Sequence, residues 1–435
     1  VCLGFQVLYN FGISTILIAK NKSGDASIWL MFGTLASLLF VIELGLTPTI
    51  QRYAAYIKAN NYNTKFFKIK KFNISELIFS SSGVYLIISF ISTIVLLLLG
   101  NLILSNLFSI SGNLLTSKQA FYFFLLKTFF YTNSIGPNAI IQGWGKFSLA
   151  KTIEGFHFFL KCLILPFIFF IEIGLETIII YDCCITLLWC ILCRYYAFKI
   201  TGLKIGSFLK LKLDFLIIRE LSPTSFKWGG MQLGGYFINY SSNIAVAQLK
   251  NPEIIASFLL TSRIINFIRT FSATPVISHM PNIFELFSKN KLFLIRELLY
   301  EKIRTSLFLF VLINLALIIV LLGLDFFNLL NPLSSYSIIL FLFIMGLLEL
   351  QHGLHAQIHM GSNEIPFVIP SLISAAFILL GHNLIDNLTI IDIISVQFFV
   401  QLSCNNWHPI YMNMKLLKFN ISSYLKNIFL FKQKL

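Results

Sequence analysis

Charged side chains are scarce in this sequence. Only 12% of its 435 residues are Asp, Glu, Lys or Arg, whereas 57% are hydrophobic, and the mean hydropathy is +0.81. A soluble globule needs more polar surface than this composition supplies. The composition therefore excludes a soluble domain and predicts an all-α integral membrane protein.

Patterns typical of enzyme sites are missing as well. The chain has no Gly-rich phosphate loop after a strand, no H-E-x-x-H and no G-x-S-x-G. No segment between the apolar stretches is long enough for a nucleotide-binding domain. We therefore expect that the protein is not an enzyme, that it uses no cofactor and that ATP does not power it directly.

Cysteine is rare, with seven residues that fall mostly in apolar stretches, where a free thiol behaves as a small hydrophobe. The pair Cys190 and Cys193 has no second pair, so we expect no metal site there. The first 19 residues lack a basic region and a small-residue cleavage site, so they are predicted to form a spanning helix and not a secretory signal.

Twelve apolar stretches of about 20 residues are each long enough to cross a bilayer. They lie near 1–19, 27–48, 75–99, 118–141, 149–171, 175–196, 224–248, 254–279, 303–324, 334–358, 364–383 and 390–412. We therefore predict about twelve transmembrane helices.

Basic residues gather in every second connection between these stretches. They are Arg52, Lys58, Lys65, Lys68, Lys70 and Lys71; Arg194, Lys199, Lys204, Lys210, Lys212, Arg219 and Lys227; Lys289, Lys291, Arg296, Lys302 and Arg304; and Lys415, Lys418, Lys426, Lys432 and Lys434. The opposite connections hold fewer basic residues and most acidic ones, among which we count Asp182. The positive-inside rule then places both termini in the cytoplasm. The net charge of +15 is thus a topology signal, and we expect no nucleic-acid partner.

A short internal repeat divides the chain into two halves. "LGLTPTIQRY" (44–53) aligns with "FSATPVISHM" (271–280), and "GFQV" from Gly4 aligns with "GMQL" from Gly230. Six predicted helices separate the copies, so the halves share one orientation, as in transporters with parallel repeats. We predict two pseudo-symmetric six-helix lobes around a central lumen. The expected bounds are 1–200 for the first lobe, 201–222 for a cytoplasmic linker, 223–414 for the second lobe and 415–435 for a basic tail.

Polar side chains repeat at helical spacing inside four of the stretches. The sets are Arg263, Asn266, Thr270 and Thr274, with Ser262 and Arg269 at the edge; Lys127, Tyr131, Ser134 and Asn138; Gln232, Tyr236, Asn239 and Asn243; and Glu154, His157 and Lys161. Such stripes either line a wet cavity or hydrogen-bond neighbouring helices to one another.

The charges within the spans favour an anionic ligand. Among intramembrane residues, we expect only Glu43 and Glu349 to lie deep enough to neutralise four cations, namely Lys127, Lys161, Arg263 and Arg269. The resulting basic interior would attract an anion, and a phosphate suits the forked donors of arginine. With Gln232, Asn239, Asn243 and Asn266, these four cations are our candidate substrate-binding residues.

One stretch carries a histidine ladder, "ELQHGLHAQIHMG". Glu349, His352, His355 and His359 lie within roughly 120° of one another around a helix. Because imidazole titrates near neutral pH, the ladder is a candidate for proton coupling or substrate contact. Structural hydrogen bonding is the alternative, and we expect no metal.

Two segments resemble a known family. "WLMFGTLASLLFVIELGLTPTIQRYAAYIKA" (29–59) resembles the second-helix signature of Wzx-type, lipid-linked O-unit flippases, which belong to the multidrug/oligosaccharidyl-lipid/polysaccharide exporter superfamily. "WGGMQLGGYFINYSSNIAVAQL" (228–249) looks like the start of the second lobe in that superfamily.

The resemblance implies a function in polysaccharide biosynthesis. It implies a transporter that flips an undecaprenyl-pyrophosphate-linked oligosaccharide, such as an O-antigen unit of lipopolysaccharide or a capsule repeat, from the cytoplasmic to the periplasmic leaflet of the bacterial inner membrane by alternating access. The implied partners are this substrate, the membrane lipids and the polysaccharide polymerase machinery. In such a transporter Gly45 and Pro48 would loosen a gate, and Glu43 and Arg52 would pair in one state only. An ordinary Pro-kinked helix end is the alternative.

Two other functions remain open at the level of sequence. A cation-coupled multidrug exporter of the same superfamily would need acidic residues in the lumen, and the first and seventh stretches contain none. A polytopic polymerase usually has one long periplasmic loop, whereas the longest outward connection here lies near 100–117. An acyltransferase would need a membrane-facing His with an acidic partner, for which Glu349 and His352 could serve.

Overall fold

In a computed structural model, the protein is helical throughout the part of the chain that the structure describes. That part comprises residues 2–58, 73–110, 114–171, 173–203, 214–327, 332–360, 362, 366–385 and 389–429, and it contains no strand. The helices are α1 (Cys2–Ala19), α2 (Ser23–Ala36), α3 (Leu39–Ile42), α4 (Leu46–Lys58), α5 (Ile74–Ile110), α6 (Leu114–Gly143), α7 (Phe147–Cys162), α8 (Ile164–Phe170), α9 (Leu175–Thr201), α10 (Phe215–Val246), α11 (Pro252–Ser272), α12 (Thr274–Ile277), α13 (Met280–Ser288), α14 (Leu292–Phe326), α15 (Tyr336–Met360), α16 (Val368–Leu384), α17 (Ile390–Cys404), α18 (His408–Leu417) and α19 (Ile421–Phe429).

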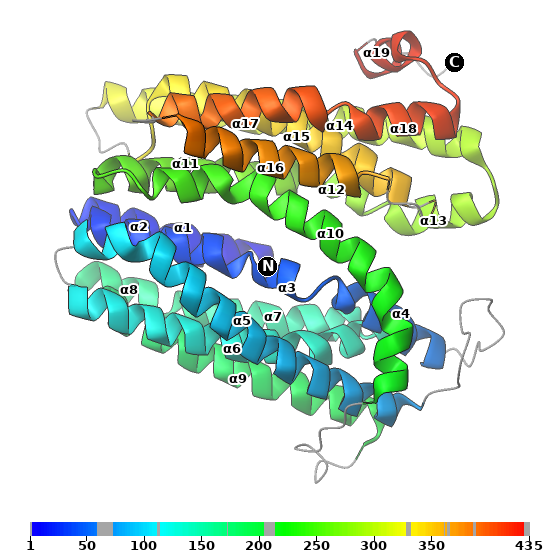
Figure 1. Cartoon of the computed structure of the whole chain (residues 1–435), viewed down its shortest axis with the longest axis horizontal. Coiled ribbons are helices and arrows are strands. Elements are labelled where there is room, and N and C mark those ends of the chain that lie inside the picture. Colours follow the sequence, from blue (N-terminus) through cyan, green and yellow to red (C-terminus); the bar gives the residue numbers. More distant parts are fainter. Residues whose placement is uncertain are drawn as a thin grey trace. The chain divides into compact units, whose positions relative to one another are not determined.

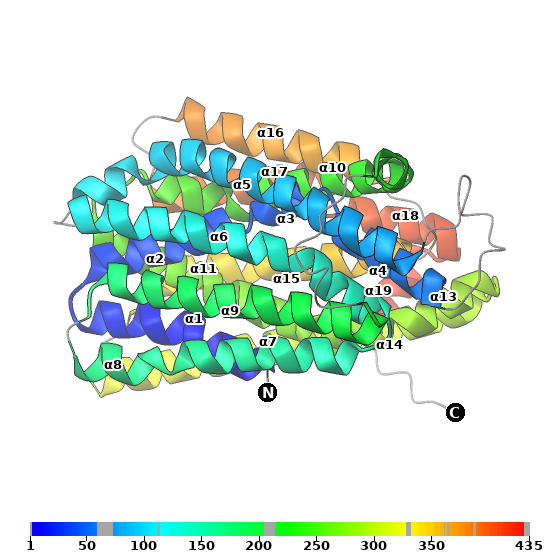
Figure 2. The ribbon, with the colours of Figure 1, turned by 90° about the horizontal axis from the view of Figure 1, so that it is seen from below.

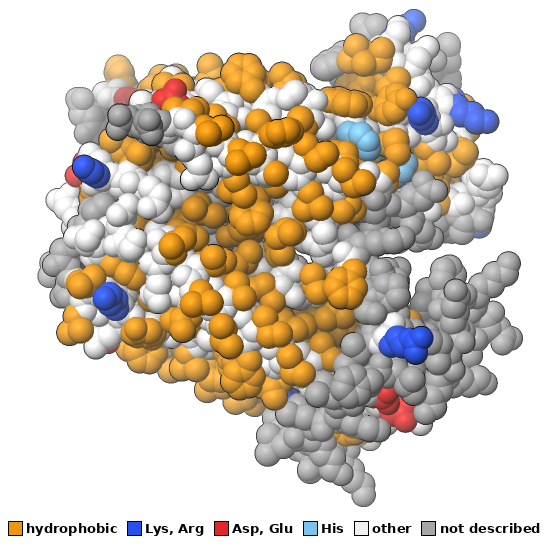
Figure 3. Space-filling view, in the orientation of Figure 1, with side chains coloured by type: hydrophobic (Ala, Val, Ile, Leu, Met, Phe, Trp, Pro, Cys, Tyr) orange, Lys and Arg blue, Asp and Glu red, His pale blue; other side chains and the backbone are white. Residues whose placement is uncertain are grey.

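The predicted all-α membrane fold is confirmed. Each of the twelve apolar stretches contains helix, and within the described ranges seven helical segments are long and apolar enough to cross a bilayer. Two shorter apolar helices lie at Gly4–Ala19 and Val368–Leu384. Apolar side chains cover much of the visible surface (Figure 3), as expected where lipid and not water is the solvent. The chain is therefore a multi-pass membrane protein.

The helices form two compact units. Unit 1 comprises Val1–Gln232 with Ala247–Ala256, and unit 2 comprises Leu233–Val246 with Ser257–Leu435. Helices α10 and α11 each contribute residues to both units.

Unit 1 is built around α6. This helix packs against α5 and α9, while α1 packs against α2 and α7, and these helices lie side by side in both ribbon views (Figures 1 and 2). Part of its core is a cluster in which Tyr85, Ile140 and Phe198 are fully or almost fully buried. Close packing of these faces places polar residues of α6, α7 and α9 next to one another.

Unit 2 packs α15 against α14 and α18, and α16 against α17 (Figure 1). Within the predicted basic tail, 415–435, the described residues 415–429 form the end of α18 and then α19. Helix α19 lies against α14 and buries Tyr424 and Ile428. The rings of Phe419 and Tyr424 stack with centroids 5.7 Å apart, so the last described helix is anchored by aromatic packing.

Both copies of the sequence repeat lie where a predicted apolar stretch, 27–48 or 254–279, is divided between helices. In unit 1 the chain breaks between α3 and α4, where Leu44 and Gly45 have φ angles of 52° and 68°. In unit 2 the aligned segment is divided into α11, α12 and α13, with Pro275 in the first turn of α12. Left-handed backbone is costly for Leu44 but not for Gly45, so the break of unit 1 is a defined structural feature.

Candidate functional site

A carboxylate inside unit 1 binds two lysines. Asp182 of α9 is fully buried, and its Oδ1 lies 2.6 Å from the Nζ of Lys161 on α7. Its Oδ2 forms an ion pair with the Nζ of Lys127 on α6. Our expectation that only Glu43 and Glu349 could neutralise the intramembrane cations is therefore wrong. Asp182 lies within α9 and not in an outward connection. With its two lysine partners, it forms a cluster of two cations and one anion.

A pocket of about 190 Å³ lies in unit 1, beside this cluster. Its polar lining comes from α1, α4, α6 and α7 and from the turn before α4, and consists of Gln6, Glu43, Thr47, Asn138, Gln142 and Glu154. Its aromatic lining includes Tyr131, His157 and Trp189. Of these, only Glu43 and Glu154 are acidic, and Glu154 is paired with Lys151 at 2.6 Å.

The aromatic side of this pocket is a stack of three rings. The rings of His157 and Trp189 lie 4.9 Å apart at 18°, and those of Tyr131 and Trp189 lie 5.3 Å apart at 28°. Three buried polar atoms of the lining residues have no hydrogen-bond partner among the described residues: Asn138 Oδ1, His157 Nε2 and Trp189 Nε1. Because buried polar atoms are normally hydrogen-bonded, three residues that line this pocket carry unsatisfied donors and acceptors, although the three atoms themselves are shielded from its open space.

One residue of the predicted gate, Glu43, lines the same pocket, together with Thr47. The hydroxyl of Thr47 donates to Glu43 Oε2 at 2.9 Å, so Tyr85, 2.8 Å away, must donate its own proton to Thr47. Pro48 is the third residue of α4. The backbone of Arg52 belongs to α4, but its side chain lies outside what the structure describes, so a pair between Glu43 and Arg52 stays a prediction.

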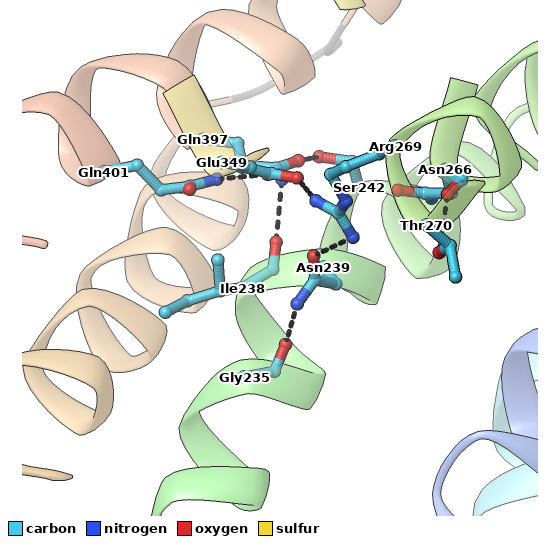
Figure 4. A network of polar contacts seen from close by, with 10 residues as sticks. All are labelled: Gly235, Ile238, Asn239, Ser242, Asn266, Arg269, Thr270, Glu349, Gln397 and Gln401. Carbon is cyan, nitrogen blue, oxygen red and sulfur yellow. Dashed lines mark hydrogen bonds and ion pairs between the residues drawn. The ribbon is translucent and has the colours of Figure 1, made fainter. Parts of the chain in front are cut away.

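Unit 2 contains a second, largely buried polar network built on an ion pair, shown in Figure 4. Arg269 of α11 pairs with Glu349 of α15 and donates from Nη2 to Asn239 Oδ1 on α10 at 3.0 Å. Gln401 of α17 donates to Glu349 Oε1 at 3.0 Å. A fourth helix, α17, thus joins the network, and its Gln397 donates to the backbone carbonyl of Ile238 at 2.7 Å.

This network borders a small polar pocket of about 30 Å³ in unit 2. Four predicted residues line it, namely Asn239, Asn243, Asn266 and Glu349. Arg263 is half-buried on α11 and does not line it, and Gln232 belongs to the part of α10 assigned to unit 1. Gln397 and Gln401 were missed by the sequence analysis. Their spacing of four residues in an apolar helix was the available signal.

The histidines of the ladder are held by α18, by α19 and by the turn between α17 and α18. Asn413 donates from Nδ2 to His355 Nδ1 at 3.0 Å, so a neutral His355 carries its proton on Nε2, which lies 2.7 Å from the Tyr424 hydroxyl. Burial raises the pKa of Tyr424, which keeps that hydroxyl neutral. His359 lies 3.2 Å from Asn413 Oδ1, and His352 lies 3.1 Å from the Asn405 carbonyl.

These contacts separate the histidines from Glu349. Glu349 accepts hydrogen bonds from α17 and pairs with Arg269 of α11. The histidines bond instead to Asn405, Asn413 and Tyr424. Among the described residues, no group of three His, Cys, Asp or Glu side chains could hold a metal ion. Proton coupling through Glu349 and the histidines stays a prediction.

Comparison with known proteins identifies the fold. No protein-family model and no curated protein matches the sequence. Solved structures do match over nearly the whole chain. An inward-facing multidrug resistance MATE family transporter of the MOP superfamily aligns with a TM-score of 0.63 and 15% identity, covering 95% of each chain.

Two further structures agree. An outward-facing multidrug resistance MATE family transporter of the MOP superfamily aligns with a TM-score of 0.56 and 13% identity, covering 98% of this chain and 94% of that one. The Vibrio cholerae MATE transporter VcmN in its bent form aligns with a TM-score of 0.56 and 14% identity, covering 98% of each chain. This chain therefore has the two-lobed, all-helical fold of the MATE transporters of the MOP superfamily.

Proposed function

We propose that this protein is a transporter that moves a lipid-linked oligosaccharide across the bacterial inner membrane by alternating access, with both termini in the cytoplasm. The fold supports a transporter, since solved proteins with this fold include outward-facing and inward-facing transporters. The resemblance of residues 29–59 and 228–249 to O-unit flippases supports the oligosaccharide.

The assignment of an oligosaccharide substrate depends on the unsatisfied polar atoms of residues that line the pocket of unit 1. Asn138 Oδ1 accepts a hydrogen bond, Trp189 Nε1 donates one, and His157 Nε2 does either according to its tautomer. Sugar hydroxyls donate and accept at once, so a sugar ring in the pocket can satisfy all three once small side-chain rotations turn these shielded atoms toward it. At about 190 Å³ the pocket is smaller than the roughly 300–1,000 Å³ of sites for drug-sized ligands, so it suits one ring of a larger substrate.

The basic residues remain our candidates for the phosphate groups of the substrate. Arg269 is a stronger candidate for phosphate binding than the lysines. The forked donors of its guanidinium can exchange one anionic partner, Glu349, for another, a phosphate. Lys127 and Lys161 are both held by Asp182, so a phosphate would have to compete with a fully buried carboxylate.

One observation favours a second candidate, a multidrug exporter. Glu43 and Glu154 line the pocket of unit 1 together with Tyr131 and Trp189. Carboxylates beside aromatic faces attract organic cations through charge and cation–π contacts. Such a ligand without hydroxyls would leave the donor of Trp189 unsatisfied, which is why we rank this function second.

The first prediction tests the pocket with a matched pair of variants on α6. Asn138→Ala removes an unsatisfied acceptor at the pocket, whereas Asn133→Ala removes an amide that is already bonded to Ser89 and Phe129. We expect Asn138→Ala to slow transport about ten-fold, the value of one hydrogen bond of about 1.4 kcal/mol to substrate. Asn133→Ala should reduce thermal stability but transport much less. The measurement is the rate at which a lipid-linked oligosaccharide in proteoliposomes becomes accessible to a membrane-impermeant glycosidase.

Two further results would contradict the proposed oligosaccharide transport. Proteoliposomes that show no oligosaccharide movement, from a protein that protects a pump-deficient host against cationic dyes, would overturn it in favour of the multidrug exporter. A chemical change in the recovered oligosaccharide would instead indicate a polymerase or acyltransferase, because a flippase leaves the structure of its substrate unaltered.

A further inference from the structure

A basic cavity lies in unit 2, away from both ion-pair networks. Its volume is about 420 Å³, and it lies at the start of α14 and the junction of α18 and α19. Three of its eight lining residues are cationic, namely Lys291, Arg296 and Lys418, and none is acidic. The candidate substrate sites do not account for this concentration of positive charge, and the positive-inside rule explains which side of the membrane it lies on but not why three cations share one cavity.

The cavity is built by two segments that are far apart in the sequence. Arg296 donates from Nη1 to the backbone carbonyl of Lys418 at 3.2 Å, which fixes the end of α18 beside the first turn of α14. The guanidinium also lies 5.1 Å from the ring of Phe293, which fixes its orientation. The first turn of the 35-residue helix α14 adds the positive end of a helix dipole to the same place.

Apolar side chains are exposed at the rim of this cavity and nearby on α19. Phe293 is 62% exposed and Leu294 is 46% exposed, and both line the cavity. On α19, Ile421 and Leu425 are exposed beside the exposed Lys426, while Tyr424 and Ile428 are buried against the unit. A surface that offers cations and exposed apolar groups together fits an amphiphile and not a soluble anion.

We propose that this cavity binds the phosphate headgroup of an anionic membrane phospholipid, with Lys291, Arg296 and Lys418 around the phosphate and Phe293 and Leu294 against the acyl chains. Basic pockets at the cytoplasmic ends of spanning helices bind anionic headgroups, and α14 begins one of the candidate membrane spans. The positive-inside rule places both segments at the cytoplasmic leaflet. This site is independent of the transported substrate.

The test is native mass spectrometry of the purified full chain, titrated with phosphatidylglycerol or phosphatidylcholine. We expect the wild type to retain phosphatidylglycerol in preference to phosphatidylcholine. Each basic residue replaced by Gln should weaken that binding about five-fold, so the variant with Lys291→Gln, Arg296→Gln and Lys418→Gln should lose roughly 100-fold. A second variant, with Lys291→Gln and Lys418→Gln only, keeps the contacts of Arg296 and should lose about 25-fold.

A control variant with Lys22→Gln, Lys118→Gln and Lys250→Gln makes the same change in net charge in unit 1 and should bind phosphatidylglycerol like the wild type. Equal affinity of this control and both cavity variants would overturn the proposal. Equal retention of the two lipids would show an apolar surface without headgroup recognition. Displacement of the lipid by soluble glycerol phosphate at matched concentration would show a site for free phosphate, which also contradicts a lipid site.

Discussion

At the scale of single residues, the pairing of Asp182 determines how the charges of unit 1 are balanced. Its carboxylate is fully buried between Lys127 and Lys161, and the latter is only 5% exposed. Removing one partner of a buried ion pair leaves an uncompensated charge and costs about 3–5 kcal/mol. Asp182→Asn leaves two such charges, so we expect a loss of at least that size, read as a lower midpoint of thermal unfolding in detergent.

Two control variants show whether the loss of stability in Asp182→Asn comes from the buried charge cluster. Glu154→Gln breaks the partly exposed pair with Lys151 and should cost at most about 1 kcal/mol. Combining Asp182→Leu with Lys127→Met and Lys161→Met should restore stability, because apolar groups of similar size replace buried ion clusters at little or no cost. An unfolding midpoint for Asp182→Asn equal to that of Glu154→Gln would show that the cluster is not coupled as the structure indicates.

The sequence indicates many of the intramembrane polar residues, although not Asp182, and it does not indicate which of them meet. The spacing of Lys127, Asn239 and Asn266 was sufficient to assign them to polar faces of helices. The partners of these faces lie on other helices, as with Asp182 on α9 and Gln401 on α17. Those pairings depend on how the helices rotate and pack, which hydropathy does not specify. The contacts of the histidine ladder with Asn413 and Tyr424 were hidden for the same reason.

At the scale of helices, the break between α3 and α4 is the feature best suited to movement. Gly45 there has a φ of 68°, and Gly202 has a similar φ of 73° at the end of α9. Replacing either by Ala in this left-handed conformation costs about 1–2 kcal/mol. Because Gly45 connects two helices within one predicted apolar stretch, 27–48, whereas Gly202 only ends α9, we expect Gly45→Ala to slow transport several-fold more than Gly202→Ala at equal stability loss.

The comparison requires both quantities for both variants, namely the thermal unfolding midpoint and the rate of transport in proteoliposomes. Equal losses of rate would mean that the strain acts through stability alone, and the break would then be an ordinary helix end. The sequence predicted a loosened segment from Gly45 and Pro48, but it did not indicate at which residue the helix breaks. The positive φ of Leu44 has no sequence signal, since leucine rarely adopts it.

At the scale of the whole molecule, the sequence predicted more than at either smaller scale. The twelve apolar stretches and the repeat were enough for an all-helical fold with two lobes, because burial in lipid demands long apolar helices whatever their detailed packing. The repeat also marked where a predicted apolar stretch of each unit is divided between helices, before α4 and before α12. The substrate is not fixed by these constraints, because one fold serves many ligands through different sites.

The source of energy is a property of the whole transporter, and the proposed substrate predicts it. A pyrophosphate-linked sugar carries negative charge, and each elementary charge that crosses a membrane gains or loses ~2.3 kcal/mol per 100 mV. We therefore expect a potassium diffusion potential to accelerate transport of substrate supplied in the leaflet on the negative side, and the reverse potential to slow it. Equal rates under both potentials would contradict electrical driving. In that case transport is tested under an imposed proton gradient, with wild type and Glu349→Gln compared. A response that Glu349→Gln abolishes would identify the pair of Arg269 with Glu349 as the coupling site, because protonation of this carboxylate would release the arginine.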